Sequence, residues 1–385
     1  MGRRPAMAVA TESESAPVAP PTALVVRVED PAVKKALKQF QDCMNTEFGE
    51  GTVQRLSSSS SLSKIDHWAS TRSIVVDKVL AGGRPMPCTL LPFGRQTEIH
   101  GLPGSGKTTL CAQISAEVQS KGGMVVAIDT EERIDHPYWS QLGVDVDRVQ
   151  SLTANSIEEV FKKQYKLLLW HISECPTLPL LMLWDSLGGT TTDAIATAIE
   201  EGEDPMEVAK KSMMMNARAI AAGMRLINPL IAKSRVAYVY TNTMYMKPNV
   251  KYGDPFETPG GWVAKYFATV RLRLKRVGQL LEEDPVTGQR KIYGHRIEVS
   301  TEKNSMAPNL IGLEGAILGG LGFSNDWTVR EIAEALKIIK KAGAWSTWVT
   351  TSGEEVKFQG FNGFVEKVKP HPEYQQLVDA VMAVL

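Results

Sequence analysis

The feature that most constrains this chain is the run GLPGSGKT, which begins at Gly101 and ends at Thr108. It matches the pattern G-x-x-x-x-G-K-[ST] in full, follows a short strand-like run (97–100) and precedes a helix-like run (109–118). In that context the run predicts a loop whose backbone amides and following helix N-terminus bind phosphate groups. A chance glycine-rich turn before a helix is the alternative, and the complete match disfavours it. We call this run the phosphate loop.

The last residues of the phosphate loop predict its chemistry. The Lys107 ammonium would reach the β and γ phosphates of a nucleotide, and the Thr108 hydroxyl would be a ligand of Mg²⁺. A carboxylate at the end of a buried strand should also hold the metal, and the apolar run 180–184 ends in Asp185. An aspartate that caps a helix is the alternative for Asp185, and the phosphate loop upstream favours the metal role. The residues assigned to the nucleotide in these two segments are Gly101, Pro103, Gly104, Ser105, Gly106, Lys107, Thr108, Thr109, Asp185 and Ser186.

Hydrolysis of a nucleotide also needs a group that orients or deprotonates the attacking water. Glu131 follows the strand-like run 124–128, and open α/β sheets bind ligands at the carboxyl ends of their strands. Asp129 and Glu132 compete with Glu131 for the role. A solvated loop carboxylate is the alternative for all three, so the residues alone leave the choice open.

Short apolar runs alternate with longer helix-like segments from about residue 95 to 275. Four runs, 97–100, 124–128, 179–184 and 236–240, are strand-like, and 297–299 is a further strand candidate. Such alternation predicts an α/β fold with a central, mainly parallel twisted sheet that helices cover on both faces.

The chain divides into four predicted parts. Residues 1–22 are rich in Ala, Pro and Ser and are expected to form a flexible tail. Residues 23–70 are expected to form an N-terminal helical arm, because apolar residues recur at helical spacing over 33–44 before the serine run 57–61. Residues 71–322 are the predicted core. Residues 323–385 are expected to form a small C-terminal α/β domain with a helix over 329–342, an aromatic and glycine-rich piece, and a final helix.

Composition excludes several classes of protein. Lys plus Arg and Asp plus Glu both number 43, so net charge does not indicate nucleic acid. Cys43, Cys88, Cys111 and Cys175 lie far apart, which argues against a zinc site or a disulfide framework and fits a reducing cytosol. No apolar run reaches the roughly 18 to 20 residues that a membrane span needs. A secretory signal is not expected either.

Together these segments resemble the RecA recombinase family, and the resemblance extends from about residue 32 to 375. The stretches that carry it are FGEG (48–51), the phosphate loop, IDTE (128–131), DHPY (135–138), LGVD (142–145), MKPNVKYGDP (246–255), GG (260–261), KYFATVR (265–271) and GAW (343–345). The resemblance implies a RecA-like P-loop NTPase core in which Glu131 is the catalytic glutamate. It also implies that Tyr138 packs on the adenine with Asp135 nearby, a contact that suits an aromatic ring.

The resemblance implies an ATP-driven recombinase that forms a helical filament on single-stranded DNA and exchanges that strand with homologous duplex DNA. ATP and Mg²⁺ would lie between neighbouring subunits, and Lys303 of the adjacent subunit would reach the γ-phosphate. Base pairing would recognise homology, so DNA binding is expected to be nearly independent of sequence. Loading or mediator proteins are further expected partners, and the expected location is the cytoplasm, at the nucleoid.

The same resemblance assigns two DNA-binding loops, at about 187–217 and 243–261. Arg218 and Arg225 lie seven residues apart on one helical face beside the first loop, and guanidinium groups bind phosphate well. Lys247 adds a charge to the second loop, where Gly260 and Gly261 give the backbone freedom to close on DNA. A solvated surface cation is the alternative for each single residue. In the run 271–276 basic residues alternate with leucines, which favours a half-exposed strand over a DNA-binding stripe.

Four features depart from the family pattern. Asn242 and Thr243 are assigned to the nucleotide, but Thr243 stands where bacterial recombinases carry a glutamine that senses the γ-phosphate. Coupling of ATP to DNA binding is therefore expected to be weaker or carried differently. Ser305 replaces a second lysine near ATP, Tyr266 replaces an interface phenylalanine, and the last residues (379–385) lack an acidic tail. These departures indicate a divergent member, and a phage origin is one hypothesis.

Two other functions use the same core. An accessory paralogue would bind ATP and DNA and remodel another recombinase, and Thr243 and Ser305 favour it. A hexameric replicative helicase would form a ring, which the N-terminal arm, the paired loop glycines and the C-terminal domain disfavour. A strand-exchange assay separates the first alternative, and electron microscopy with ATP and single-stranded DNA separates the second.

Overall fold

The structure, a computed structural model, describes residues 30–53, 65, 67–84, 90–247, 253–283, 288–309 and 312–384. These belong to two units, Met1–Ser61 and Leu62–Leu385. The described part of the first unit is mainly α1 (Pro31–Phe48), which confirms the predicted helix. Proline at its first position and the Asp30 side chain, which accepts from the Ala32 amide at 2.8 Å, start this helix. The predicted tail (1–22) and the serine run (57–61) lie outside the described residues.

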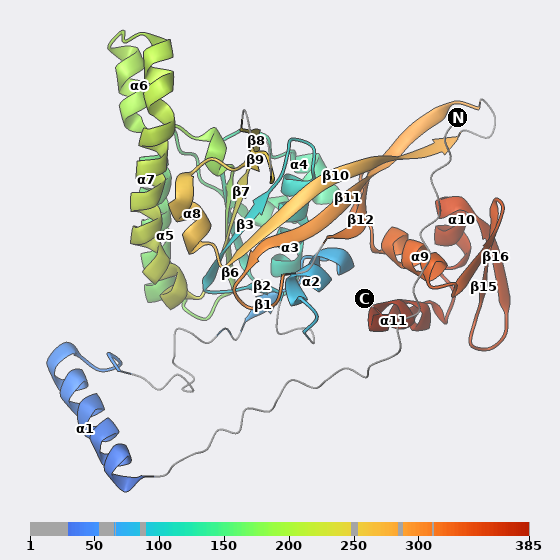
Figure 1. Ribbon diagram of the computed structural model, residues 1–385, viewed down its shortest axis with the longest axis horizontal. Helices are drawn as coiled ribbons and strands as arrows, with labels where there is room; N and C mark the ends of the chain where they lie inside the picture. The colour runs from blue at the N-terminus through green and yellow to red at the C-terminus, as the bar shows by residue number, and fades with distance from the viewer. Residues whose placement is uncertain are drawn as a thin grey trace. The chain divides into compact units, whose positions relative to one another are not determined.

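A nine-stranded sheet forms the centre of the second unit, in the order β13-β12-β11-β10-β3-β7-β6-β4-β5 (Figure 1). The five pairs from β10 to β5 are parallel and the three from β13 to β10 are antiparallel, which confirms the predicted mainly parallel sheet. The candidate strand 297–299 lies in an antiparallel strand. The strands are β3 (Arg95–His100), β4 (Met124–Asp129), β5 (Val149–Ser151), β6 (Leu180–Asp185), β7 (Ala237–Asn242), β10 (Val270–Glu283), β11 (Arg290–Asn304), β12 (Leu313–Leu318) and β13 (Gly322–Phe323).

Helices cover both faces of this sheet, as the continuous apolar strands predicted. In β4, Val125 and Ala127 pack into one core cluster, and Val126 and Ile128 pack into the other. The first cluster also draws on α2 (Ile74–Ala81), α3 (Lys107–Ser120) and α4 (His136–Gln141). The second draws on α5 (Ile157–Glu174), α7 (Pro205–Ser234) and α8 (Gly261–Phe267). Each fully buried Val, Ile or Leu contributes about 1.5 to 3 kcal/mol, so both helical layers are needed for stability.

The segment expected to be the first DNA loop (187–217) is largely helical, so the prediction of a loop there is wrong. It contains a 3-10 turn (Leu187–Gly189), α6 (Asp193–Glu200) and the first part of α7, beside which α6 packs. The helix α7 begins with proline at its first position, and the Asp204 side chain accepts from the Met206 amide at 2.9 Å. Local start signals and residues of good helix propensity therefore decide this segment.

The C-terminal part has its own hydrophobic cluster and a three-stranded antiparallel sheet. The expected helix over 329–342 is wrong in its second half, because α9 ends at Ala335 and Lys337 adopts a positive φ of 59°. Ile339 instead starts a strand and pairs with Trp348, so cross-strand burial overrides the helical spacing. The predicted domain boundaries stay predictions. The elements are α9 (Asn325–Ala335), β14 (Ile339–Ala342), β15 (Trp345–Val349), β16 (Glu355–Gln359), α10 (Gly360–Lys367) and α11 (Tyr374–Val384).

Two short antiparallel strand pairs complete the second unit, and one of them lies in the expected second DNA loop. That pair, the β8-β9 hairpin, joins β8 (Tyr245–Met246) to β9 (Phe256–Glu257). The other joins β1 (Trp68–Ala69) to β2 (Leu91–Pro92), and α2 lies between these two strands in the sequence. Within the described ranges, no helix combines the length and apolar character that crossing a membrane requires.

Candidate nucleotide site and DNA-facing surface

The phosphate loop joins the end of β3 to the start of α3, as the sequence predicted. Two of its glycines lie too close to neighbouring atoms to carry a side chain. A Cβ on Gly101 would lie 2.3 Å from the Leu274 carbonyl oxygen, and a Cβ on Gly106 would lie 2.1 Å from the Ile317 side chain. Gly106 also has φ of 93°, which favours glycine. The loop borders a cavity of about 220 Å³, which we call the nucleotide cavity; its lining is Pro103, Gly104, Gly106, Lys107, Thr108, Thr109, Glu131, Arg133, Asp185 and Thr243.

Lys107 enters the nucleotide cavity, where its hydrogen-bond partners among the described residues are neutral. Its Nζ donates to the carbonyl oxygens of Gly101 at 3.0 Å and Leu102 at 3.3 Å. Burial lowers the pKa of this ammonium, and the nearby carboxylates of Asp185 and Glu131 oppose that effect. A phosphate in the cavity would supply the counter-charge that the carbonyl groups lack.

Asp185 and Thr108 come together at the same cavity. Thr108 Oγ1 donates to Asp185 Oδ2 at 2.7 Å, and the Thr241 hydroxyl donates to Oδ1. Burial raises the pKa of Asp185, these two hydroxyls oppose the rise, and the carboxylates of Glu131 and Asp129 add to it. Such crowding of acidic groups favours a divalent cation.

The donors around Asp185 fit Mg²⁺ held together with a nucleotide. One carboxylate and one hydroxyl are hard oxygen ligands, and Mg²⁺ sites usually add substrate phosphates and water to so few protein ligands. Among the described residues, no group of three or more His, Cys, Asp or Glu side chains forms a separate metal cage. The phosphate loop and Asp185 thus provide an incomplete site that phosphate oxygens would complete.

Glu131 is the only one of the three competing carboxylates among the residues that line the nucleotide cavity. Ser186 donates to its Oε1, and Arg133 Nη1 lies 2.8 Å from its Oε2. Asp129 is occupied by the amides of Glu131, Arg133 and Ile134, at 2.8 to 3.1 Å. Glu132 lines a different cavity, of about 310 Å³, together with Asp129. The geometry therefore favours Glu131 for orienting water.

The expected adenine side lies at the start of α4. The Asp135 carboxylate accepts from the Tyr138 amide at 2.9 Å and caps this helix. The Tyr138 hydroxyl lies 3.0 Å from Thr109 Oγ1, so the ring is held beside α3, whose first residues border the nucleotide cavity.

Asn242 and Thr243 have different surroundings. Thr243 lines the nucleotide cavity, but the buried Asn242 does not. The Asn242 Nδ2 donates to Glu98 at 2.9 Å and to the Pro259 carbonyl at 3.0 Å, which joins β7 to the second DNA loop. Ser105 is buried, and its hydroxyl has no partner among the described residues.

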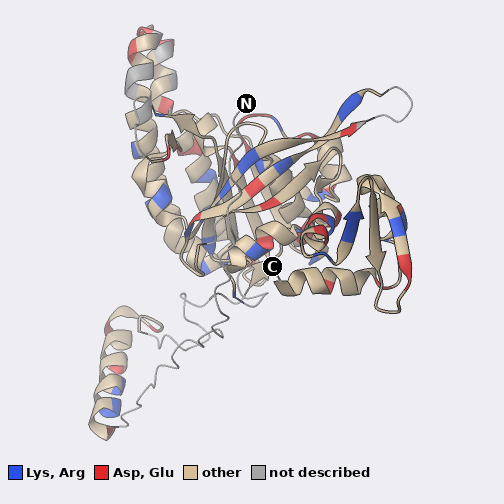
Figure 2. Ribbon diagram, turned by 45° about the vertical axis from the view of Figure 1, so that its right-hand side comes forward, with Lys and Arg blue, Asp and Glu red and all other residues tan. Residues whose placement is uncertain are grey.

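Of the predicted DNA-binding residues, Arg218 and Arg225 lie on α7, Gly260 and Gly261 lie at the start of α8, and Lys247 follows β8. Arg218 and Arg225 are both exposed on α7, and within the described part of the chain neither forms an ion pair. A Cβ on Gly261 would lie 3.2 Å from the Ala217 side chain, so the end of the expected second DNA loop packs on α7 at the residue before Arg218. Lys247 is instead paired with Glu257 across the β8-β9 hairpin. Figure 2 shows acidic and basic residues interspersed along the ribbon.

Comparison with known proteins decides the family. The model of the RecA N-terminal domain matches residues 32–167 and 179–324. The chain belongs to the RecA family. It is 29% identical over 340 residues to "Protein RecA" of Bdellovibrio bacteriovorus, covering 88% of this chain and 82% of the relative. It is 30% identical over 354 residues to "Protein RecA" of Chloroflexus aurantiacus (91% and 92%), and 29% identical over 340 residues to "Protein RecA 2" of Myxococcus xanthus (88% and 87%).

Within this RecA family member, Lys303 lies at the end of β11, outside the nucleotide cavity of its own subunit. Its Nζ donates to the carbonyl groups of Tyr266 at 2.7 Å and Lys265 at 3.2 Å, and it lies 5.8 Å from the centre of the Tyr266 ring. Tyr266 is 69% exposed. The pair thus forms a surface feature that a neighbouring subunit can meet.

Two residues of the site, Arg133 and Thr241, were missed by reasoning from motifs, and so was the bond between Ser186 and Glu131. Arg133 lines the nucleotide cavity and pairs with Glu131, and its place two residues after Glu131 was an available signal. The bonds of Thr241 to Asp185 and of Ser186 to Glu131 join different strand ends, and no local pattern predicts them. The prediction that residues 271–276 form a half-exposed strand is confirmed, since Leu272 and Leu274 are buried in β10.

Proposed function

We propose that this RecA family member is an ATP-dependent recombinase that forms a helical filament on single-stranded DNA and exchanges the strand with homologous duplex DNA. The observation that carries the proposal is that Lys107, Thr108, Asp185 and Glu131 meet at one cavity. The segment that follows Asp185 leads to α7. The relatives named RecA support the same function. A protein with this role would act on DNA at the nucleoid.

The residues of the cavity suit ATP hydrolysis with Mg²⁺. Lys107 would bind the β and γ phosphates, and Thr108 and Asp185 would hold the metal. Bound Mg²⁺ neutralises charge that develops on the phosphate oxygens. Glu131 would orient the attacking water, while its contact with Arg133 keeps its carboxylate in place. Lys303 would come from the adjacent subunit, so turnover would depend on assembly.

Contacts of Glu131 suggest how DNA could affect turnover. A Cβ on Gly189 would lie 3.1 Å from the Glu131 side chain, and Ser186 bonds to both the Glu131 carboxylate and the Gly189 amide. Gly189 begins the segment that continues through α6 into α7, where Arg218 lies. A shift of that segment on DNA binding would therefore reach the water-orienting carboxylate. ATP would in turn favour the assembled state, because it gains contacts from the second subunit only there.

Electron microscopy of the full chain with ATP and single-stranded DNA, together with a strand-exchange assay, tests the proposal. We expect helical filaments and ATP-dependent exchange of a homologous strand. Closed rings would instead indicate the helicase alternative. Filaments or DNA binding without any exchange would indicate the accessory paralogue, which Thr243 and Ser305 favour.

Replacing both Arg218 and Arg225 by alanine should weaken binding to single-stranded DNA about equally for different sequences. Both side chains are exposed and without an ion pair among the described residues, so they are available to phosphate. The slope of log affinity against log salt concentration should fall by up to roughly 0.7 for each phosphate group that the protein no longer binds. Lys233→Ala, an exposed cation near the far end of the same helix, is the matched control. An unchanged slope in the double variant would show that the arginines do not bind phosphate.

A further inference from the structure

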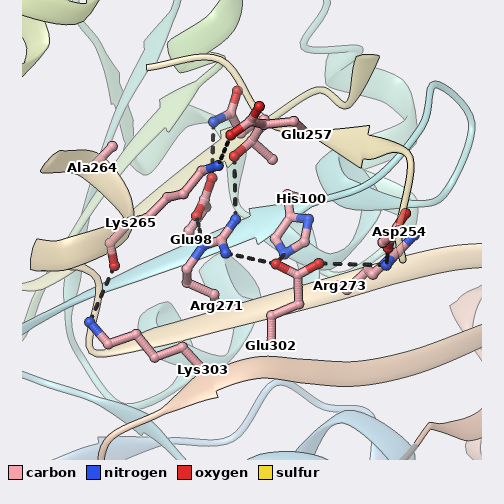
Figure 3. Close-up of polar contacts among 12 residues, drawn as sticks. Glu98, His100, Asp254, Glu257, Ala264, Lys265, Arg271, Arg273, Glu302 and Lys303 are labelled. Carbon is pink, nitrogen blue, oxygen red and sulfur yellow. Dashed lines mark hydrogen bonds and ion pairs between the residues drawn. The ribbon is translucent and has the colours of Figure 1, made fainter. Parts of the chain in front are cut away.

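A series of charged side chains connects the strand before the phosphate loop to the second DNA loop (Figure 3). Its members are Glu98 of β3, Arg271 and Arg273 of β10, Glu302 of β11 and Asp254 of the loop. We call it the ion-pair chain. The chemistry proposed for ATP hydrolysis uses none of these five residues, so their arrangement needs a separate explanation.

The inner end of the ion-pair chain is a buried, fully paired carboxylate. Glu98 is completely buried three residues before Gly101, and it accepts from Arg271 Nε and from Asn242 Nδ2. The same two side chains also contact the second DNA loop: Arg271 Nη2 lies 3.3 Å from Thr258 Oγ1, and Asn242 Nδ2 also donates to the Pro259 carbonyl. Removing Arg271 would leave Glu98 as a buried charge without its ionic partner, which is strongly destabilising.

A β-bulge brings the middle member of the chain to its place. In the β10-β11 register Arg271 faces Lys303 and Leu272 faces Thr301, which leaves Glu302 as the extra residue. A bulge redirects the side chain of the extra residue. Here Glu302 meets Arg271 and Arg273, on the face of β10 opposite the buried Leu272.

Glu302 therefore joins the two arginines. Its Oε2 accepts from Arg271 Nη1 at 2.7 Å, and its Oε1 lies 3.6 Å from Arg273 Nη1. His100 Nε2 is also 3.4 Å from Glu302, but burial and the neighbouring cations hold the pKa of this imidazole well below its usual value. His100 is thus neutral at physiological pH, and the arginines are the ionic partners of Glu302.

The outer end of the chain holds the loop itself. Arg273 donates to Asp254, whose other oxygen accepts from the Phe256 amide at 2.9 Å and so fixes the turn into β9. Arg273 is 21% and Asp254 42% exposed, so this pair is accessible to solvent and can break without unfolding the core. The loop itself starts at Thr243, which lines the nucleotide cavity.

We propose that Arg273, Glu302 and Asp254 are positioning residues that make the second DNA loop move together with β3, the strand before the phosphate loop. Through this link, the nucleotide bound at the phosphate loop changes the affinity for DNA. The inference rests on the proposed function. Thr243 offers only a short hydroxyl at the start of the loop, whereas the ion-pair chain holds Asp254 and Thr258 in the second half of the loop. Both ends of the loop are then fixed to neighbouring strands of one sheet, and a displacement of β3 reaches both.

The test compares single-stranded DNA affinity with ADP and with a non-hydrolysable ATP analogue. We expect Asp254→Asn and Arg273→Gln each to reduce the ratio of the two dissociation constants by about two- to fivefold, the range that a partly exposed ion pair supports. The double variant should lose no more than either single variant, because the two residues act through one contact. Arg273→Lys keeps the charge and should retain most of the wild-type ratio.

Lys275→Gln is the matched control. Lys275 lies two residues further along β10, where its Nζ is 3.9 Å from Glu298, and it acts on Asp254 only as a longer-range charge. This variant should keep the wild-type ratio, and all variants should match the wild type in thermal unfolding and in ATP hydrolysis without DNA. A wild-type ratio in both single variants, or additive losses in the double variant, would overturn the ion-pair chain as the coupling element. A wild type that binds no single-stranded DNA with either nucleotide would overturn the proposed function itself.

Discussion

Replacing Lys107 by alanine should abolish ATP turnover and ATP-dependent DNA binding while the chain remains folded. Within the described residues the Lys107 ammonium donates to two backbone carbonyl groups, and burial lowers its pKa. The two carbonyl groups do not neutralise this ammonium, so its charge is available to a phosphate group, and the alanine variant lacks that charge. Loss of one preorganised donor at a site of developing negative charge costs about 10² to 10³ in rate, and weaker ground-state binding of phosphate adds to that. The site should then be inactive at ordinary ATP concentrations.

The measurement is ATP hydrolysis with and without single-stranded DNA, with circular dichroism as the check of folding. Lys121→Ala is the control, because Lys121 follows the other end of the same helix, is 54% exposed and pairs with Glu117 at 2.9 Å. It should hydrolyse ATP at the wild-type rate. Wild-type turnover by a folded Lys107→Ala protein would show that the phosphate loop does not bind the transferred phosphate.

The core of the site could be predicted because parallel topology alone brings its residues together. Asp129 faces Asp185 in the β4-β6 register, and His100 faces Asn242 in the β3-β7 register. Each of these residues ends its strand, so the residues that follow meet at one edge of the sheet. The phosphate loop, Asp185 and Glu131 could thus be placed without knowledge of any side-chain contact.

The helices in 187–217 were missed because the resemblance assigned a loop there. The local sequence contained a better signal, with Asp204 and Pro205 at the start of a long helix. The strand at 339–342 was missed for the opposite reason. Its local spacing fits a helix, and only pairing with Trp345 and Trp348, beyond the turn at Gly343, makes it a strand.

Side-chain pairing between distant segments could not be predicted at all. Lys247 was expected to offer a free charge to DNA, but Glu257 neutralises it across a hairpin that has no regular strand signature. Glu302 meets Arg271 and Arg273 only because of a one-residue bulge, and a bulge reverses the face that strand alternation predicts. These pairs depend on register, which is a property of the assembled sheet.

Replacing Glu131 by glutamine should slow ATP hydrolysis by about 10² to 10⁴, the usual contribution of a positioned acid–base group, while ATP binding and assembly on DNA persist. Glutamine keeps the size of the side chain and an oxygen that can accept from Ser186. It cannot accept a proton from water at neutral pH, and it loses the ion pair with Arg133. Filaments formed with ATP should therefore outlast those of the wild type.

The control for this prediction is built into the chain. Glu132 is the next residue, but it has a positive φ of 53° and lines a different cavity, so Glu132→Gln should leave turnover unchanged. Single-turnover hydrolysis and filament lifetime by electron microscopy separate the two variants. If Glu132→Gln slowed hydrolysis and Glu131→Gln did not, the assignment of Glu131 would be wrong and Glu132 would orient the water. If both variants hydrolysed ATP normally, neither glutamate would orient the water. Asp129 would not replace them, because its carboxylate is already occupied by three backbone amides.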